Sequence, residues 1–90
     1  MSVRLPETLD LKAAGPLREM LMAARGAPVE IDASGVERLG GLCLQVLLSA
    51  QATWATDGQP FAITAASSAF AEGARRMGAQ DLAPDPIIQE

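Results

Sequence analysis

The best-placed acid in this 90-residue chain is Asp32, which ends a short predicted strand at 29–32 and could serve as a general acid or base. An aspartate at the start of a turn more often accepts hydrogen bonds from backbone amides two residues further on. Here those amides belong to Ser34 and Gly35. We therefore predict a structural role for Asp32 and a turn role for the Ser34 hydroxyl.

The pair Gly40-Gly41 stands before a stretch with helical spacing of apolar residues, and Cys43 lies just after it. The first amides of such a helix could cradle an anion. The glycines could equally serve only to permit a tight turn. Cys43 could be a reactive thiol near a helix start, but burial statistics favour a small buried apolar side chain.

The composition excludes several classes of function. The net charge is −4, so the chain offers no basic surface for nucleic acid. It has no histidine, one cysteine and no phosphate-binding glycine motif, so we predict no metal site, no cofactor and no enzymatic activity. A single cysteine fits a reducing cytoplasm, and neither a signal peptide nor an apolar run long enough to span a membrane is visible.

The elements that position these residues begin with a buried strand at 29–32, rich in β-branched residues. A turn at 33–35 and a second extended piece at 36–39 follow it, and a helix is predicted from Gly41 to Thr56. Trp54 on this helix is expected to pack in the core, where its indole N–H would need a partner.

The remaining elements alternate in the same way. We predict an edge strand at 2–5, a helix at 12–24 capped by Asp10, a strand at 61–64 and a helix from Ser67 or Ser68 to Met77. Alternation of strands and helices is typical of an α/β domain with a parallel sheet. The predicted fold is one small domain at 1–82 with a tail at 83–90. It has a mixed, mostly parallel sheet of about four strands, with about three helices packed on one face.

Several short motifs in this order resemble the STAS domain, the family of anti-anti-sigma factor antagonists and of the cytoplasmic tails of sulfate transporters. The clearest is Ile31-Asp32-Ala33-Ser34-Gly35-Val36, where the family has an apolar-Asp-apolar-Ser-Gly-Val pattern. The loop and helix start at 39–48, the turn and strand at 57–63 and the last helix at 69–82 are also similar. Leu9-Asp10-Leu11 and Leu17-Arg18-Glu19 fit the family's first helix.

The chain departs from the family at the site of its phosphoswitch. Phosphorylatable members carry Asp-Ser-Ser-Gly or Asp-Thr-Ser-Gly in the loop before the second helix. Alignment on the flanking leucines places Gly40, Gly41, Leu42 and Cys43 at these positions. Leu42 therefore stands at the phosphoacceptor position and has no oxygen to accept a phosphoryl group. If regulation by phosphate has moved, Ser67 and Ser68 are the preferred acceptors over Ser34, and over Ser49, which we expect to be buried on the second helix.

The resemblance implies a non-catalytic protein-interaction module of bacterial signalling. Its partner would be a histidine-kinase-like ATPase or another component of an anti-sigma or chemotaxis pathway. The first alternative is a STAS subunit of a lipid or anion transporter. A third interpretation is a domain that binds a small ligand, a nucleotide or a lipid, as the resemblance implies for some relatives. In the first two cases we expect the partner to be a protein, with no direct membrane insertion. The expected partner-binding residues are Ser34, Gly40, Gly41, Leu42 and Gln45.

Overall fold

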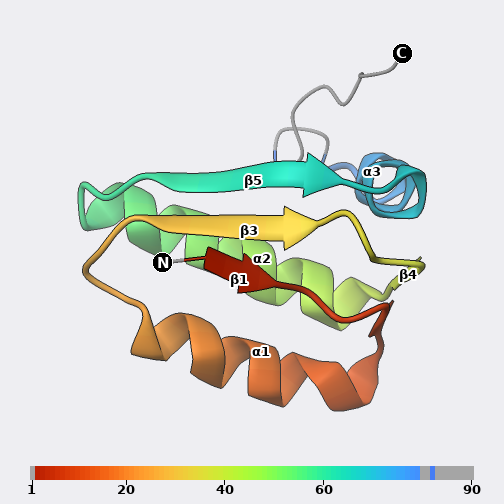
Figure 1. The fold of residues 1–90 in the computed structure, drawn as a ribbon, viewed down its shortest axis with the longest axis horizontal. Helices are drawn as coiled ribbons and strands as arrows, with labels where there is room; N and C mark the ends of the chain where they lie inside the picture. The colour runs from red at the N-terminus through yellow and green to blue at the C-terminus, as the bar shows by residue number, and fades with distance from the viewer. Residues whose placement is uncertain (1, 80–81, 83–90) are drawn as a thin grey trace.

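The computed structural model describes residues 2–79 and 82, in which three α-helices alternate with short parallel strands (Figure 1). This confirms the predicted fold class. The predicted tail at 83–90 lies outside the described residues. The elements are β1 (Ser2–Arg4), β2 (Thr8–Leu9), α1 (Leu11–Ala23), β3 (Val29–Ala33), β4 (Arg38–Leu39), α2 (Gly41–Thr56), β5 (Phe61–Ala66) and α3 (Ser68–Arg76).

The main sheet has three parallel strands in the order β1-β3-β5, so the strand predicted to be central is central. Alternate residues of β3 point to opposite faces, as the period of a strand requires. Val29, Ile31 and Ala33 are buried, whereas Glu30 is exposed and Asp32 is only half-buried. The inward face therefore joins the core and the outward face is polar.

The strands do not form one sheet of four, because β2 and β4 make a separate two-stranded parallel sheet. Sequence analysis did not find β2, since two residues are too few to display an alternating pattern. Its pairing depends on residues thirty positions away: the Gly40 amide donates to the Leu9 carbonyl oxygen at 2.8 Å. The Glu37 amide likewise donates to the Glu7 carbonyl oxygen at 2.7 Å. This small sheet fixes the start of α2 to the chain just before α1.

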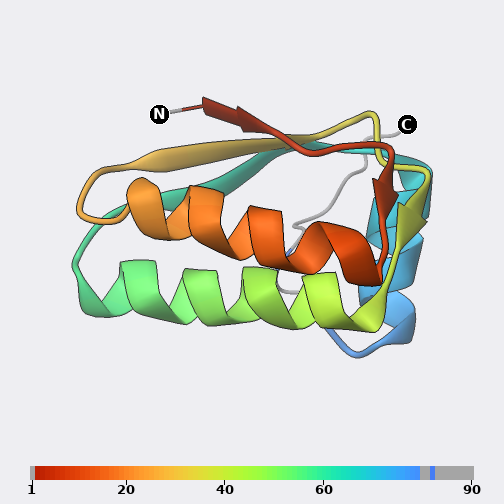
Figure 2. The ribbon, with the colours of Figure 1, turned by 90° about the horizontal axis from the view of Figure 1, so that it is seen from below.

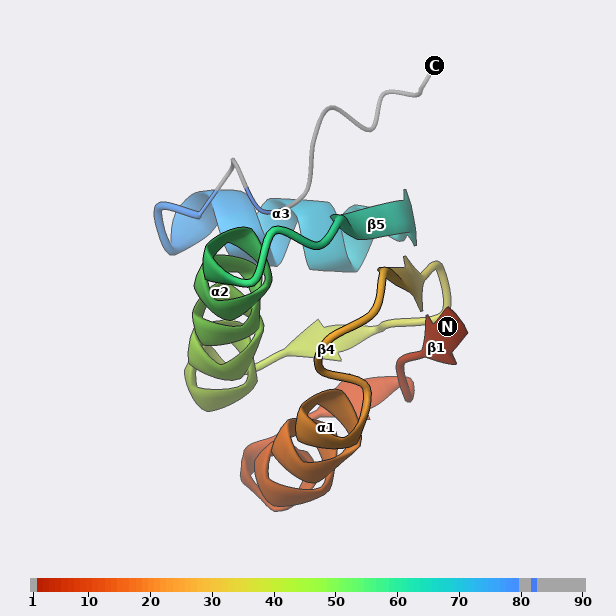
Figure 3. The ribbon, with the colours of Figure 1, turned by 90° about the vertical axis from the view of Figure 1, so that its left-hand side faces the viewer.

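Helices α1 and α2 lie side by side on one face of the main sheet (Figure 2). Helix α3 differs from them in direction, because it lies beyond the carboxyl end of β5 and crosses the direction of α1 and α2 (Figures 1 and 3). Only Ser67 separates β5 from α3, so the chain has no length in which to return over the sheet. Ser67 caps α3 by accepting from the Phe70 amide, and its hydroxyl donates to the Val36 carbonyl oxygen.

The first helix begins at Leu11 with Asp10 as its cap, as predicted, and its Oδ1 accepts from the Ala13 amide at 3.1 Å. It runs without a break through the exposed Pro16. Gly26 and Gly78 follow α1 and α3 with positive φ angles, which glycine adopts without strain.

The core lies between the sheet and the two side-by-side helices. Trp54 is 1% exposed, and its indole N–H donates to the Ala27 carbonyl oxygen at 2.8 Å, so the predicted partner exists. The Trp54 ring meets Phe61 of β5 edge to face, with centroids 6.0 Å apart. Leu82 is buried, which confirms that the chain returns to the core after α3.

Candidate functional site

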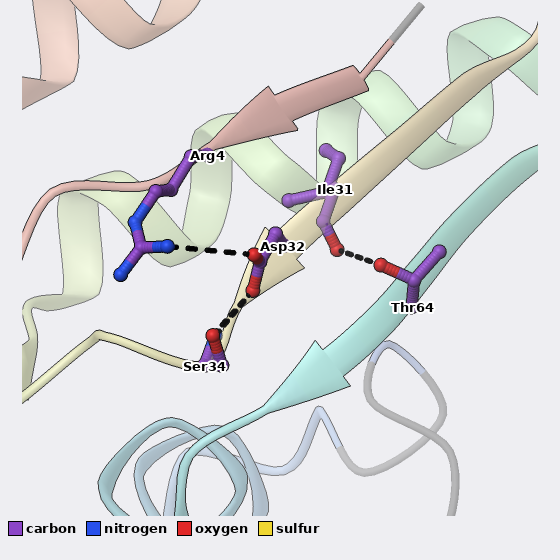
Figure 4. Close-up of polar contacts among 5 residues, drawn as sticks. All are labelled: Arg4, Ile31, Asp32, Ser34 and Thr64. Carbon is purple, nitrogen blue, oxygen red and sulfur yellow. Dashed lines mark hydrogen bonds and ion pairs between the residues drawn. The ribbon is translucent and has the colours of Figure 1, made fainter.

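Polar side chains at the end of β3 and in the loop after it bind one another (Figure 4). Asp32 Oδ1 accepts from both the Ser34 amide at 2.9 Å and the Ser34 hydroxyl at 2.6 Å. Arg4 Nη1 lies 3.9 Å from the other carboxylate oxygen. The hydrogen bonds from Ser34, with the positive charge of Arg4, lower the pKa of Asp32, so this carboxylate is ionised at neutral pH. The turn role predicted for Asp32 and Ser34 is confirmed.

The glycine pair at the start of α2 has two different roles. A Cβ on Gly40 would lie 2.8 Å from the Leu9 carbonyl oxygen, so the close approach of α2 to β2 requires a glycine there. A Cβ on Gly41 would meet nothing closer than Met77 Sδ at 3.9 Å, which is an ordinary contact. The geometry of Gly40 thus favours the interpretation as a tight structural position.

Cys43 lies in the first turn of α2 with its side chain turned into the core. Its Sγ contacts the Asp10 carbonyl oxygen at 3.3 Å. Burial, together with the negative charge of Asp10, raises the pKa of the Cys43 thiol, so the reactive thiolate is disfavoured at neutral pH. Cys43 is therefore a buried structural residue, as the burial statistics indicated.

Leu42 points outward instead of filling the core, with 48% of the residue exposed. It lines an open groove of about 380 Å³ that runs along α2 and is bordered on its other side by α1. Gln45, another predicted partner-binding residue, is exposed and lines the same groove. Ser34, Gly40 and Gly41 do not line it. The structure thus brings two of the five predicted residues together in one concave surface.

Sequence analysis missed the α1 side of this groove. Arg18 and Met22 stand one helical turn apart on α1 and line the groove, and Met22 is 50% exposed. Ser49 also lines the groove and is exposed, so the expectation that it is buried is wrong. The signal that could have revealed this surface is the absence of any charged residue from α2.

The sequence matches the family described as Mlab, STAS domain, over residues 1–88. The chain belongs to the STAS domain family. This confirms the resemblance carried by the motif around Asp32 and agrees with the α/β fold. Separate searches of curated proteins and of solved structures found no match.

The STAS domain shown here has no helix, within residues 2–79 and 82, that is long and apolar enough to cross a membrane. Among the same residues, no three acidic, cysteine or histidine side chains gather into a metal-binding group.

The two preferred alternative phosphoacceptors, Ser67 and Ser68, differ in environment. Ser67 is half-buried and its hydroxyl is engaged at the cap of α3, whereas Ser68 is exposed in the first turn of α3.

Proposed function

We propose that this STAS domain is a non-catalytic, cytoplasmic interaction module of a bacterial signalling pathway. In this proposal it docks a regulatory protein through the start of α2 and lacks the phosphoswitch of its family. The observation that carries the proposal is the exposure of Leu42 at the edge of a groove. A leucine exposed in the first turn of a helix gives little to folding, and burial against a partner would remove its apolar surface from water.

The side chains around Leu42 support docking over chemistry. Cys43 is buried with a raised thiol pKa, and Asp32 and Ser34 are engaged with each other. The start of α2 thus presents a neutral, largely apolar surface rather than a nucleophile or a general base. A surface of this type binds another protein by excluding water.

The partner in this proposal is a histidine-kinase-like ATPase or another signalling component, as the family resemblance suggests. A transporter subunit remains the alternative, and it would dock on the same surface. The two are separated by which proteins the domain retains from cells that express it naturally. A kinase or chemotaxis component supports the proposal, and a transporter ATPase or permease supports the alternative.

The test compares wild type, Leu42→Asp and Leu11→Asp in cross-linking and quantitative mass spectrometry from such cells. Leu11 is the matched control, because it is an exposed leucine in the first turn of α1 that does not line the groove. We expect Leu42→Asp to lower recovery of the partner at least tenfold, which is about 1.4 kcal/mol, with an unchanged melting temperature. Equal recovery with all three proteins contradicts the proposal.

A second measurement addresses the phosphoswitch. Incubation of the domain with ATP and the recovered kinase should leave the Gly40–Cys43 segment without phosphate. Phosphate on Ser68 would show that the switch has moved to the start of α3, where added negative charge suits the helix dipole. If phosphate on Ser68 also changes the affinity for the partner, the proposed absence of a phosphoswitch is contradicted.

A further inference from the structure

Helix α2 has a composition that is unusual for a surface helix. Its sixteen residues include no charged side chain, although the chain as a whole is 20% charged. Leu42, Gln45 and Ser49 are exposed, so the water-facing side of the helix is neutral. An amphipathic helix of a globular domain normally carries charged residues on its outer face, and a neutral helix is one that becomes covered.

The shape of the groove indicates what kind of element covers it. Lining residues on α2 extend from Leu42 to Trp54, a rise of about 18 Å, or a little over three helical turns. Both walls are helices, whose backbone groups bond within each helix, so an added strand would find no free edge to pair with. An amphipathic helix laid between α1 and α2 needs only side-chain contacts, and Leu42 and Met22 supply exposed apolar surface for them.

The charge of the groove distinguishes a foreign helix from a second copy of this chain. Arg18 is the only charged residue that lines the groove, and no carboxylate within the described residues forms an ion pair with it. A two-fold dimer through this surface would bury two Arg18 side chains, and the lining contains no acidic residue to pair with either of them. A partner with a carboxylate at this position would instead gain a charge-assisted hydrogen bond.

We infer that the α1–α2 groove holds an amphipathic α-helix of the partner protein, with an acidic residue of that helix paired to Arg18. This inference rests on the proposed function and extends it from the start of α2 along the length of the groove. It names the kind of partner segment: about three turns of helix, with apolar residues at i, i+3 or i+4 and i+7, and a flanking Glu or Asp.

The direct test uses two synthetic helical peptides of about four turns, each with side chains linked at i and i+4, since short free helices are marginal in water. They share the apolar spacing and differ only in a flanking Glu or Lys. Fluorescence anisotropy with the full chain should show that the Glu peptide binds at least tenfold more tightly. Arg18→Glu should reverse that preference. Arg75→Glu, the same change at an exposed arginine of α3 that does not line the groove, should leave it unchanged.

Three results would overturn the inference. The first is no saturable binding of the Glu peptide, and the second is binding that Arg18→Glu does not alter. The third is a dimer in sedimentation equilibrium that Met22→Asp converts to monomer, because a second copy would then occupy the groove.

Recovery of the natural partner with each variant shows whether the inference, the proposed function or both fail. If Leu42→Asp loses the partner while Arg18→Glu retains it, docking is confined to the start of α2 and only the inference fails. If both variants retain the partner, the proposed function fails as well. Loss with both variants, and retention with Arg75→Glu, supports both.

Discussion

The loop after β3 and the start of α2 lie at the same end of the domain, at the carboxyl ends of the strands, and differ in how their side chains are used (Figures 1 and 4). In the loop, the polar atoms of Asp32 and Ser34 bond to each other. At the start of α2, Leu42 leaves apolar surface in contact with water. The residues that carry reactive groups therefore shape the fold, and a residue without one is the better candidate for binding.

This difference has a general physical cause. The Ser34 amide and hydroxyl occupy Oδ1 of Asp32, and Arg4 lies beside Oδ2, so this carboxylate is held in its turn. An exposed leucine keeps an unfavourable contact with water that a partner can remove. A site for protein docking can thus be found by looking for apolar surface that folding leaves uncovered, even where catalytic side chains lie nearby.

The largest effect expected is that of Ile31→Asp. Ile31 is 0% exposed on the central strand, next in sequence to the outward-facing Asp32. A carboxylate there would be buried without a partner, at a cost comparable to the whole stability of a small domain, on the order of 5 kcal/mol or more. Circular dichroism should show no cooperative melt. A melt near the wild-type temperature would mean that the strand assignment is wrong.

A smaller effect is expected from the first glycine at the start of α2. Gly40→Ala forces a Cβ against the Leu9 carbonyl oxygen, so we expect a loss of about 1–3 kcal/mol in the free energy of unfolding. Gly41→Ala is the matched control and should change that free energy by less than about 1 kcal/mol. Urea unfolding of both variants measures this. Equal effects would show that β2 and α2 do not meet as closely as the structure has them.

We expect the stability of the domain to depend modestly on pH through the Asp32–Ser34 contacts at the end of β3. The pKa of Asp32 is lowered in the folded state by the hydrogen bonds from Ser34, so its contribution to stability is present at neutral pH. That contribution is lost as the pH falls through and below the ordinary carboxylate range near 4. Asp57, whose pKa is lowered by its hydrogen bond and ion pair with Arg25, adds to the same loss.

Thermal melts of wild type and Asp32→Asn between pH 7 and pH 3 test this dependence. The variant should have a lower melting temperature at pH 7, and its melting temperature should fall less steeply with acid. Arg25→Gln provides an independent comparison for Asp57. If the melting temperature of Asp32→Asn falls with acid as steeply as that of the wild type, the Ser34 contacts do not favour the ionised form of Asp32.

The smallest effect on folding is expected from Leu42→Asp, the substitution that should most affect partner binding. Leu42 is half exposed, and a negative charge near the start of α2 suits the helix dipole. The free energy of unfolding should change by less than about 0.5 kcal/mol. A loss several times larger in urea unfolding would assign Leu42 to the core and remove it from the docking surface.

Much of the fold could be predicted from the sequence, because it follows from short-range patterns. The run at 29–32, the Asp10 cap and the glycines after α1 and α3 each act within a few residues, and the structure has all of them. The motif around Asp32 was sufficient to identify the STAS domain. The absence of a nucleophilic oxygen at Leu42 is likewise a property of residue type alone.

What only the tertiary structure decided depends on contacts between distant parts of the chain. The strand at Thr8–Leu9 exists because residues near Gly40 pair with it, and α3 lies directly beyond the end of β5 because Ser67 alone connects the two. The groove is formed by Arg18 and Met22 from one helix and Leu42 from another. Each helix alone shows only its own apolar face. Which part of that face stays uncovered is fixed by how closely the two helices approach, and that distance is set by packing across the whole core.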